Sequence, residues 1–147
     1  MRISVIGGGR IGEADTEIAY EVGKLLGKQG HSLVCGGCTG VMEAACRGAK
    51  ETGGQTIGIL PGVDPSEAND FVDVPIATGL SNVRNVLVAL NGEAVIAIDG
   101  SYGTLSEIAH ALDFGRPVAG IGTHEITGVE TVDSAEAAVA YVEKMLE

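Results

Sequence analysis

The chain has 147 residues, a net charge of −11 and a hydrophobic fraction of 45%, with only 3% aromatic residues. This length fits one domain, residues 1–147, with a core of aliphatic side chains. The acidic surface disfavours nucleic-acid binding because it would repel a phosphate backbone, and no apolar run reaches the roughly 18 residues of a membrane span.

Strand-like and helix-like segments alternate along the chain. In chain order, the apolar pattern predicts a strand at 2–6, a helix at 14–28, a strand at 32–35, a helix at 40–52, strands at 56–60 and 71–76, a helix at 81–90, a strand at 94–98, a helix at 104–114, a strand at 117–121 and a helix at 134–146. Ser81 is the expected N-cap of its helix. Repeated β-α-β units with right-handed crossovers predict an α/β fold. The fold class is Rossmann-like and doubly wound, a mainly parallel sheet with helices on both faces.

Glycines gather where three of these strands end, at 7–9, 36–40 and 100–103. In a parallel sheet these ends share one edge, where ligands bind at the point of strand-order reversal. Glycine gives a ligand access to the free N–H groups at a helix start, which attract phosphate. The three turns therefore predict a pocket for a phosphorylated small molecule.

Residues 7–12 superficially match the dinucleotide pattern G-x-G-x-x-G. That pattern needs an acidic residue about twenty positions on, at the end of the second strand. This chain has Cys35, Gly36 and Gly37 there, so we expect no nicotinamide cofactor. Gly8 and Gly9 either contact the substrate or form a tight turn that admits helix packing.

The turn at residues 100–104 adds hydroxyl donors, from Ser101 and Thr104, to its free amides. In a competing interpretation Thr104 caps the following helix and Glu107 completes a capping box, which would make Glu107 structural. Tyr102 either stacks on a base or is an exposed turn residue. Both pairs of alternatives stay open.

Cys35 and Cys38 form a CxxC pattern beside a β-α-β unit, which can indicate a redox pair or half of a zinc site. The phosphate turn already explains the two glycines between them, and no second CxxC exists. We therefore expect no metal. Three cysteines are too few for a disulfide framework, and the amino terminus lacks a signal-peptide pattern, so we expect a cytoplasmic protein.

Two motifs resemble one known family. GGCTGVM at 36–42 and GGQTIGILP at 53–61 are similar to the first signature of the LOG family of cytokinin riboside 5′-monophosphate phosphoribohydrolases. GSYGTLSE at 100–107 resembles that family's P-G-G-x-G-T-x-x-E motif, and Arg84 aligns with its upstream arginine. The resemblance covers residues 4–118 and is nearest to the compact branch that includes molybdenum-cofactor carrier proteins.

This resemblance implies a homodimer or homotetramer that binds a phosphorylated small molecule. Cytokinin-activating members hydrolyse the N-glycosidic bond of nucleoside 5′-monophosphates, giving a base and ribose 5-phosphate. Carried over, Arg84 and Glu107 would be catalytic, with Glu107 facing the ribose and stabilising positive charge in the transition state. The candidate phosphate- and nucleotide-binding residues are Gly8, Gly9, Gly36, Gly37, Gly40, Gly100, Ser101, Tyr102, Gly103 and Thr104.

The chain also departs from the enzymes of that family. Asp99 and Ser101 stand where they have proline and glycine, and Asn85 replaces the usual lysine. The leading hypothesis is a protein that cleaves nucleoside 5′-monophosphates, which Arg84 and Glu107 favour. The departures at Asp99 and Asn85 favour a rival hypothesis, a non-catalytic carrier of molybdenum cofactor or a related phosphorylated ligand. Neither hypothesis requires a resident cofactor, and the expected ligand is a nucleotide or molybdenum cofactor. Both remain open at this point.

Overall fold

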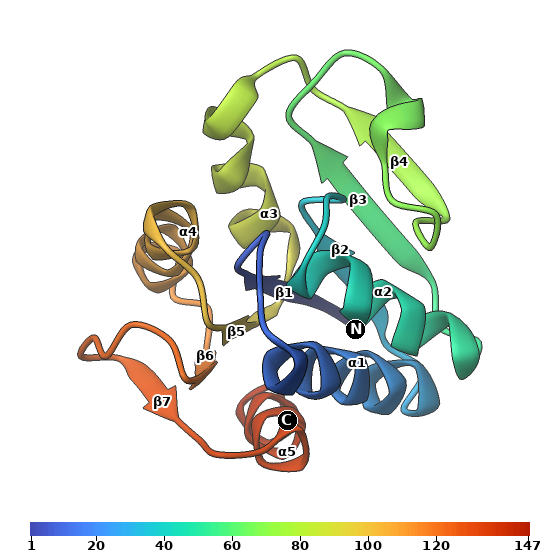
Figure 1. Ribbon diagram of the computed structural model, residues 1–147. Helices are drawn as coiled ribbons and strands as arrows, with labels where there is room; N and C mark the ends of the chain where they lie inside the picture. Colours follow the sequence, from blue (N-terminus) through green and yellow to red (C-terminus); the bar gives the residue numbers. More distant parts are fainter.

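Seven parallel strands form one sheet in a computed structural model of residues 1–147 (Figure 1). The elements, in chain order, are β1 (Arg2–Gly7), α1 (Glu13–Lys28), β2 (Ser32–Cys35), α2 (Val41–Glu51), β3 (Thr56–Leu60), the 3-10 turn η1 (Pro65–Glu67), β4 (Val74–Ala77), the 3-10 turn η2 (Ser81–Arg84), α3 (Asn85–Asn91), β5 (Ala94–Ile98), α4 (Tyr102–Asp113), β6 (Val118–Ile121), β7 (Val129–Thr131) and α5 (Ala135–Met145). None of the helices combines the length and apolar character needed to cross a bilayer.

The strand order β4-β3-β2-β1-β5-β6-β7 reverses direction between β1 and β5. Every neighbouring pair is parallel, with Ile6 opposite Ala97 and Gly7 opposite Ile98 at the carboxyl ends of the two central strands. The predicted Rossmann-like α/β fold is confirmed. The point of reversal lies between two glycine-rich turns, which is where such sheets bind ligands.

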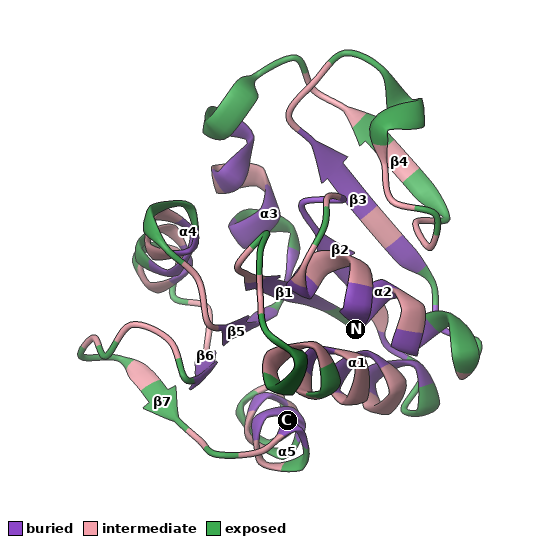
Figure 2. Cartoon of the chain, in the orientation of Figure 1, coloured by how far each residue is buried: buried purple, intermediate pink, exposed green.

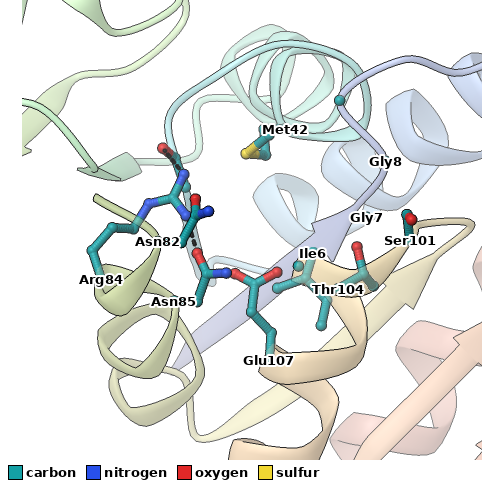
Figure 3. A pocket seen from close by; sticks show the side chains of 13 residues that line it. Ile6, Gly7, Gly8, Met42, Asn82, Arg84, Asn85, Ser101, Thr104 and Glu107 are labelled. Atoms are coloured by element: carbon teal, nitrogen blue, oxygen red, sulfur yellow. Dashed lines mark hydrogen bonds between the residues drawn. The ribbon is translucent and has the colours of Figure 1, made fainter. Parts of the chain in front are cut away.

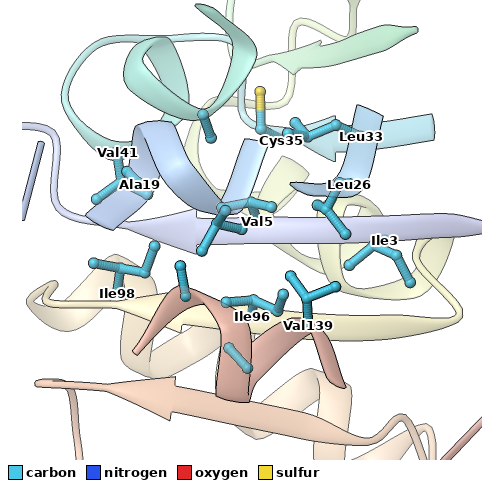
Figure 4. Close-up of a cluster of buried hydrophobic side chains, with 14 of the residues drawn as sticks. Ile3, Val5, Ala19, Leu26, Leu33, Cys35, Val41, Ile96, Ile98 and Val139 are labelled. Atoms are coloured by element: carbon cyan, nitrogen blue, oxygen red, sulfur yellow. The ribbon is translucent and has the colours of Figure 1, made fainter. Parts of the chain in front are cut away.

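Helices cover both faces of the sheet, as Figure 1 shows. α1, α2 and α5 share one core with β1, β2 and β5, while α3 and α4 enclose a second core on the opposite face. Purple segments in Figure 2 mark these buried surfaces, and every residue of β5 is buried. Figure 4 shows the larger core, built from aliphatic side chains such as Ile3, Val5 and Leu26.

Glycine lets α1 and α2 pack backbone against backbone. A Cβ on Gly23 would stand 1.9 Å from the carbonyl oxygen of Ala45, and one on Gly48 would stand 2.0 Å from that of Tyr20. Neither distance leaves room for a methyl group. The high glycine content therefore partly serves helix packing, in addition to the turns.

Two elements differ from their predicted bounds by three or more residues, and a third element was not predicted. The strand expected at 71–76 lies at Val74–Ala77, on the sheet edge, where Pro75 removes no interior ladder bond. The helix expected at 81–90 begins as the 3-10 turn η2, and Ser81 is not its N-cap, because Ser81 has φ of +53° and makes no capping bond. The short edge strand β7 was not predicted, since two of its three residues are exposed and it has no alternating pattern.

Candidate functional site

A pocket of about 210 Å³ opens at the carboxyl ends of the strands, beside the reversal between β1 and β5 (Figure 3). The turns after β1 and β2 form one wall, and η2, α3 and the first turns of α4 form the other. Its lining residues are Ile6, Gly7, Gly8, Gly9, Gly36, Met42, Asn82, Arg84, Asn85, Ser101, Gly103, Thr104 and Glu107.

The turn before α4 has an unusual backbone. Asp99 has φ of +53° and Gly100 has φ of +106°, and a Cβ on Gly100 would lie 2.3 Å from Thr104 Oγ1. The neighbouring loop holds this turn from outside: Thr123 Oγ1 donates to the Asp99 carbonyl at 2.6 Å, and His124 Nε2 lies 2.9 Å from the Ser101 carbonyl oxygen. The first turn of α4 is thereby fixed at the pocket.

The hydroxyls of Ser101 and Thr104 have no hydrogen-bond partner within the protein, although Thr104 is buried. Both side chains line the pocket, as Figure 3 shows. α4 begins at Tyr102, with Ser101 as the residue before it and no side-chain cap. The alternative in which Thr104 and Glu107 form a capping box is therefore wrong, because Thr104 lies inside the helix rather than before it.

Glu107 is 7% exposed and accepts no hydrogen bond from the protein. Its carboxyl group lies on the pocket wall near Asn85 (Figure 3). Burial raises the pKa of Glu107 to about 7, and the positive charge of Arg84 partly opposes that rise. A carboxyl with such a pKa can hold or release a proton near neutral pH.

Arg84, 8% exposed, is committed to the protein itself. Nε donates to the Ile59 carbonyl at 2.8 Å, Nη2 donates to the Gly36 carbonyl at 3.4 Å, and Nη1 donates to Asn85 Oδ1. The guanidinium thus ties the ends of β2 and β3 to the start of α3. Asn85 extends this network, because its Nδ2 donates to Ser106 Oγ at 3.3 Å.

The structure brings eight of the twelve predicted site residues to this pocket: Gly8, Gly9, Gly36, Arg84, Ser101, Gly103, Thr104 and Glu107. Gly37, Gly40 and Gly100 instead shape the turns behind it. A Cβ on Gly37 would meet Leu60, and one on Gly40 would stand 2.2 Å from the Gly8 carbonyl oxygen. Tyr102 is 84% exposed and lines a neighbouring hollow.

Sequence reasoning missed five pocket residues, Ile6, Gly7, Met42, Asn82 and Asn85. Asn85 was noted only as a departure from a family motif, yet it is 6% exposed and links Arg84 to α4. The available signal was the position of Asn85 directly before the apolar run at 86–90. Asp99, another departure from the family motif, does not line the pocket, and its Oδ2 lies 2.8 Å from where a Gly8 Cβ would stand.

The cysteines do not pair as the CxxC pattern suggests. Cys35 Sγ lies 3.5 Å from Cys46 Sγ inside the core, whereas Cys38 Sγ lies 3.5 Å from the Gly36 carbonyl oxygen. No group of three or more His, Cys, Asp or Glu side chains converges as a metal site would require. The two buried thiols belong to the packing between β2 and α2.

Comparison of the sequence with known families and proteins gives a consistent result. A family model described as the SLOG cluster4 family matches residues 1–147. An uncharacterized protein of Archaeoglobus fulgidus is 44% identical over 96% of this chain and 93% of its own length. The cytokinin riboside 5′-monophosphate phosphoribohydrolase of Mycobacterium tuberculosis is 32% identical over 74% of this chain, which spans only 58% of that enzyme.

Solved structures extend the similarity to the whole fold. The molybdenum cofactor binding protein of Rippkaea orientalis superposes with a TM-score of 0.94 and 34% identity, covering 99% of this chain and 97% of that one. The molybdenum cofactor carrier protein of Chlamydomonas reinhardtii gives a TM-score of 0.89 and 35% identity at the same coverage.

Proposed function

This chain belongs to the SLOG cluster4 family, and from that premise we propose that it binds and carries a phosphorylated small molecule in the Ser101–Glu107 pocket. The observation that carries the proposal is the unpartnered pair of hydroxyls, Ser101 and Thr104, at the start of α4 inside a glycine-walled pocket. Two hydroxyls and the free amides of a helix start are a donor set suited to phosphate.

The glycines support this proposal sterically. A Cβ on Gly36 would stand 2.8 Å from Arg84 Nη2, and one on Gly8 would stand 2.8 Å from Asp99 Oδ2. Side chains at these positions would disturb the wall facing the phosphate. The backbone of Gly8 and Gly9 therefore provides a close-fitting surface for an anion.

The pocket is small for a complete ligand. Its volume of about 210 Å³ lies below the roughly 300–1,000 Å³ of most ligand pockets. A hollow of about 700 Å³ adjoins it, shares Asn82, Asn85 and Gly103 with it, and is lined by Val83 and Tyr102. The phosphate end of the ligand would occupy the pocket, and a flat heterocycle would lie against Tyr102 outside it.

Carriage is favoured over cleavage by two observations. The similarity to the molybdenum cofactor binding and carrier proteins spans nearly the full length of both chains, whereas the chain spans 41%, 58% and 47% of the cytokinin enzymes that it matches. Arg84, which would assist a reaction, has its guanidinium engaged by Ile59, Gly36 and Asn85. Molybdenum cofactor would be the cargo and not a resident group.

Glu107 supports a second candidate function, hydrolysis of nucleoside 5′-monophosphates. Its carboxyl faces the pocket, makes no hydrogen bond to the protein and has a pKa raised to about 7. A carboxyl placed beside the ribose stabilises the positive charge of glycosidic cleavage when ionised, and donates a proton when neutral. This role requires a ribose beside Glu107 when phosphate is held at Ser101.

We also infer self-assembly as a homodimer or homotetramer. Large apolar side chains are exposed on η2 and α3, among them Val83 at 67% and Leu90 at 41%. Because each copy has a net charge of −11, an uncharged surface such as this one lets two copies meet with little electrostatic repulsion. Light scattering measures the molar mass in solution and tests the inference. V83E should have a lower mass than the unchanged protein, and equal masses would contradict it.

One experiment separates carriage from hydrolysis. The protein is incubated with molybdopterin and, separately, with a panel of nucleoside 5′-monophosphates, and bound pterin and free base are both quantified. Carriage predicts one pterin bound per chain, recovered unchanged, with no base released. Base release that Glu107→Gln abolishes would establish the hydrolase, and failure to bind any of these compounds would overturn both.

A further inference from the structure

A second cavity, of about 400 Å³, adjoins the phosphate pocket at Gly9. Residues from the loop before α1, from α1 and from α2 line it, including Arg10, Thr16, Glu43 and Arg47. Gly9 lines both cavities, so the two cavities adjoin at this residue.

Two positive charges face this cavity in a strongly acidic protein. The chain has five arginines and twenty carboxylate side chains, so an arginine without a carboxylate partner is unexpected. Nevertheless, Arg10 and Arg47 make no salt bridge and no hydrogen bond within the protein. Their guanidinium groups remain available to a ligand.

Arg47 is also held in position. Its guanidinium carbon lies 4.5 Å from the centroid of the Tyr20 ring, in a cation–π contact. Glu43 stands four residues earlier on α2, a spacing that normally favours an ion pair, but the two side chains do not form one. Glu43 is the one carboxylate that lines the cavity, so the lining keeps a net positive charge.

We propose that Arg10 and Arg47 form a second anion subsite, which binds a further phosphoryl group of the ligand whose first phosphate lies at Ser101 and Thr104. The inference rests on the proposed function, because it extends the same ligand across Gly9. Arginine suits this task, since its planar fork donates two hydrogen bonds to one phosphoryl group. The two sites together would hold a small molecule with two phosphoryl groups, such as a nucleoside diphosphate or bisphosphate. A ligand with a single phosphate, such as molybdopterin, would fill only the first site.

Titration of the ¹⁵N-labelled protein with inorganic phosphate tests the subsite by nuclear magnetic resonance. Two sets of amide shifts are expected, one at residues 101–104 and one at residues 9–10 and 43–47, each with its own dissociation constant. The R10Q/R47Q variant should lose the second set and keep the first. K28Q/K144Q, which removes two exposed lysine charges elsewhere, should keep both.

The two proposals fail in different ways in this titration. Shifts confined to residues 101–104 in the unchanged protein would overturn the second subsite and leave the first intact, and shifts absent from residues 101–104 would overturn the proposed function. Adenosine 5′-diphosphate and adenosine 3′,5′-bisphosphate provide a second readout. At least one should bind about tenfold more tightly than the 5′-monophosphate, and R10Q/R47Q should abolish that gain. An equal gain in R10Q/R47Q would overturn the subsite.

Discussion

Arg84 and Glu107 line one pocket without forming an ion pair. The guanidinium of Arg84 instead donates to the carbonyls of Ile59 and Gly36 and to Asn85 Oδ1. Its charge therefore acts on Glu107 only through space, and it offsets only part of the rise in pKa that burial causes. The result is a carboxyl in the site that is about half protonated near pH 7.

The first prediction concerns the pH dependence of stability. The pKa of Glu107 is about 7 in the folded protein against 4.5 for an ordinary glutamate. Between these values the folded protein retains a proton that the unfolded chain has released, so the free energy of unfolding falls as the pH rises from about 4.5 to 7. At 1.36 kcal/mol per pKa unit, the loss contributed by Glu107 is about 3 kcal/mol.

Glu107→Gln should lack this part of the pH dependence. Denaturant unfolding gives the free energy of unfolding of each protein at pH 5 and at pH 8. The change between the two pH values should be smaller for Glu107→Gln than for the unchanged protein. Glu13→Gln, at the exposed first residue of α1, serves as the control and should follow the unchanged protein. Parallel curves for the unchanged protein and Glu107→Gln would show that Glu107 is not responsible.

The second prediction concerns the two roles of Arg84. Arg84→Met removes the only positive charge that lowers the pKa of Glu107, so that pKa should rise above 7 in a ¹³C carboxyl titration. The substitution also removes the guanidinium donor from the carbonyls of Ile59 and Gly36, at a cost of roughly 1–3 kcal/mol for a buried carbonyl left unpaired.

Arg84→Lys separates these effects. A lysine keeps the positive charge but cannot donate in the three directions of the guanidinium. The stability loss should therefore persist, while the pKa of Glu107 changes less than in Arg84→Met. Arg116→Met, at the opposite end of the sheet, controls for charge and should leave the pKa of Glu107 unchanged. A fall of that pKa in Arg84→Met would be incompatible with the present assignment.

The third prediction concerns the phosphate donors. Ser101→Ala and Thr104→Val each remove one hydroxyl that has no partner in the protein and should weaken binding of a phosphorylated ligand about tenfold, since a hydrogen bond to a charged group contributes roughly 1.5–3 kcal/mol. Isothermal titration calorimetry measures the change. Unfolding stability should hardly alter.

Ser134→Ala provides the reverse control. Ser134 Oγ accepts from the amide of Ala137 at 3.1 Å and caps α5, so its loss should lower stability by about 1 kcal/mol without affecting the ligand. Equal effects of Ser101→Ala and Ser134→Ala on binding would indicate that the pocket hydroxyls act only through folding.

The fourth prediction concerns the glycine turns. Gly40 has φ of +69°, and a Cβ there would stand 2.2 Å from the Gly8 carbonyl oxygen, which also accepts from the amide of Val41 at 3.0 Å. Gly40→Ala should therefore destabilise the protein by more than about 2 kcal/mol and displace the Gly8 wall. At Gly12 no atom lies within 4 Å of the added carbon, so Gly12→Ala should lower the free energy of unfolding by less than about 1 kcal/mol. Similar unfolding midpoints for the two variants would refute the steric argument.

The sequence pattern was sufficient to predict six of the seven strands and the edge of the sheet at which the pocket lies. The continuous apolar run at Ala94–Ile98 and the glycines after β1, β2 and β5 correctly predicted a buried parallel strand and a shared edge. It failed where short elements depend on tertiary contacts, as for β7 and for the 3-10 turn at Ser81.

The sequence also could not predict which glycines line the pocket and which only allow the backbone to turn. Gly8 and Gly40 have the same residue type in similar turns, yet one lines the pocket and the other supports its backbone. Asn85 acquires its role only because Arg84 and Ser106, from two different helical segments, meet beside it. Such contacts arise from packing, which local pattern does not encode.

The central claim is that the start of α4 holds the phosphate of a small ligand. The most direct measurement is the electron density of the phosphate in crystals soaked with adenosine 5′-monophosphate or molybdopterin. The account predicts phosphate oxygens within about 3 Å of Ser101 Oγ and Thr104 Oγ1. A phosphate bound elsewhere, or a pocket left empty by both compounds at saturating concentration, would contradict it.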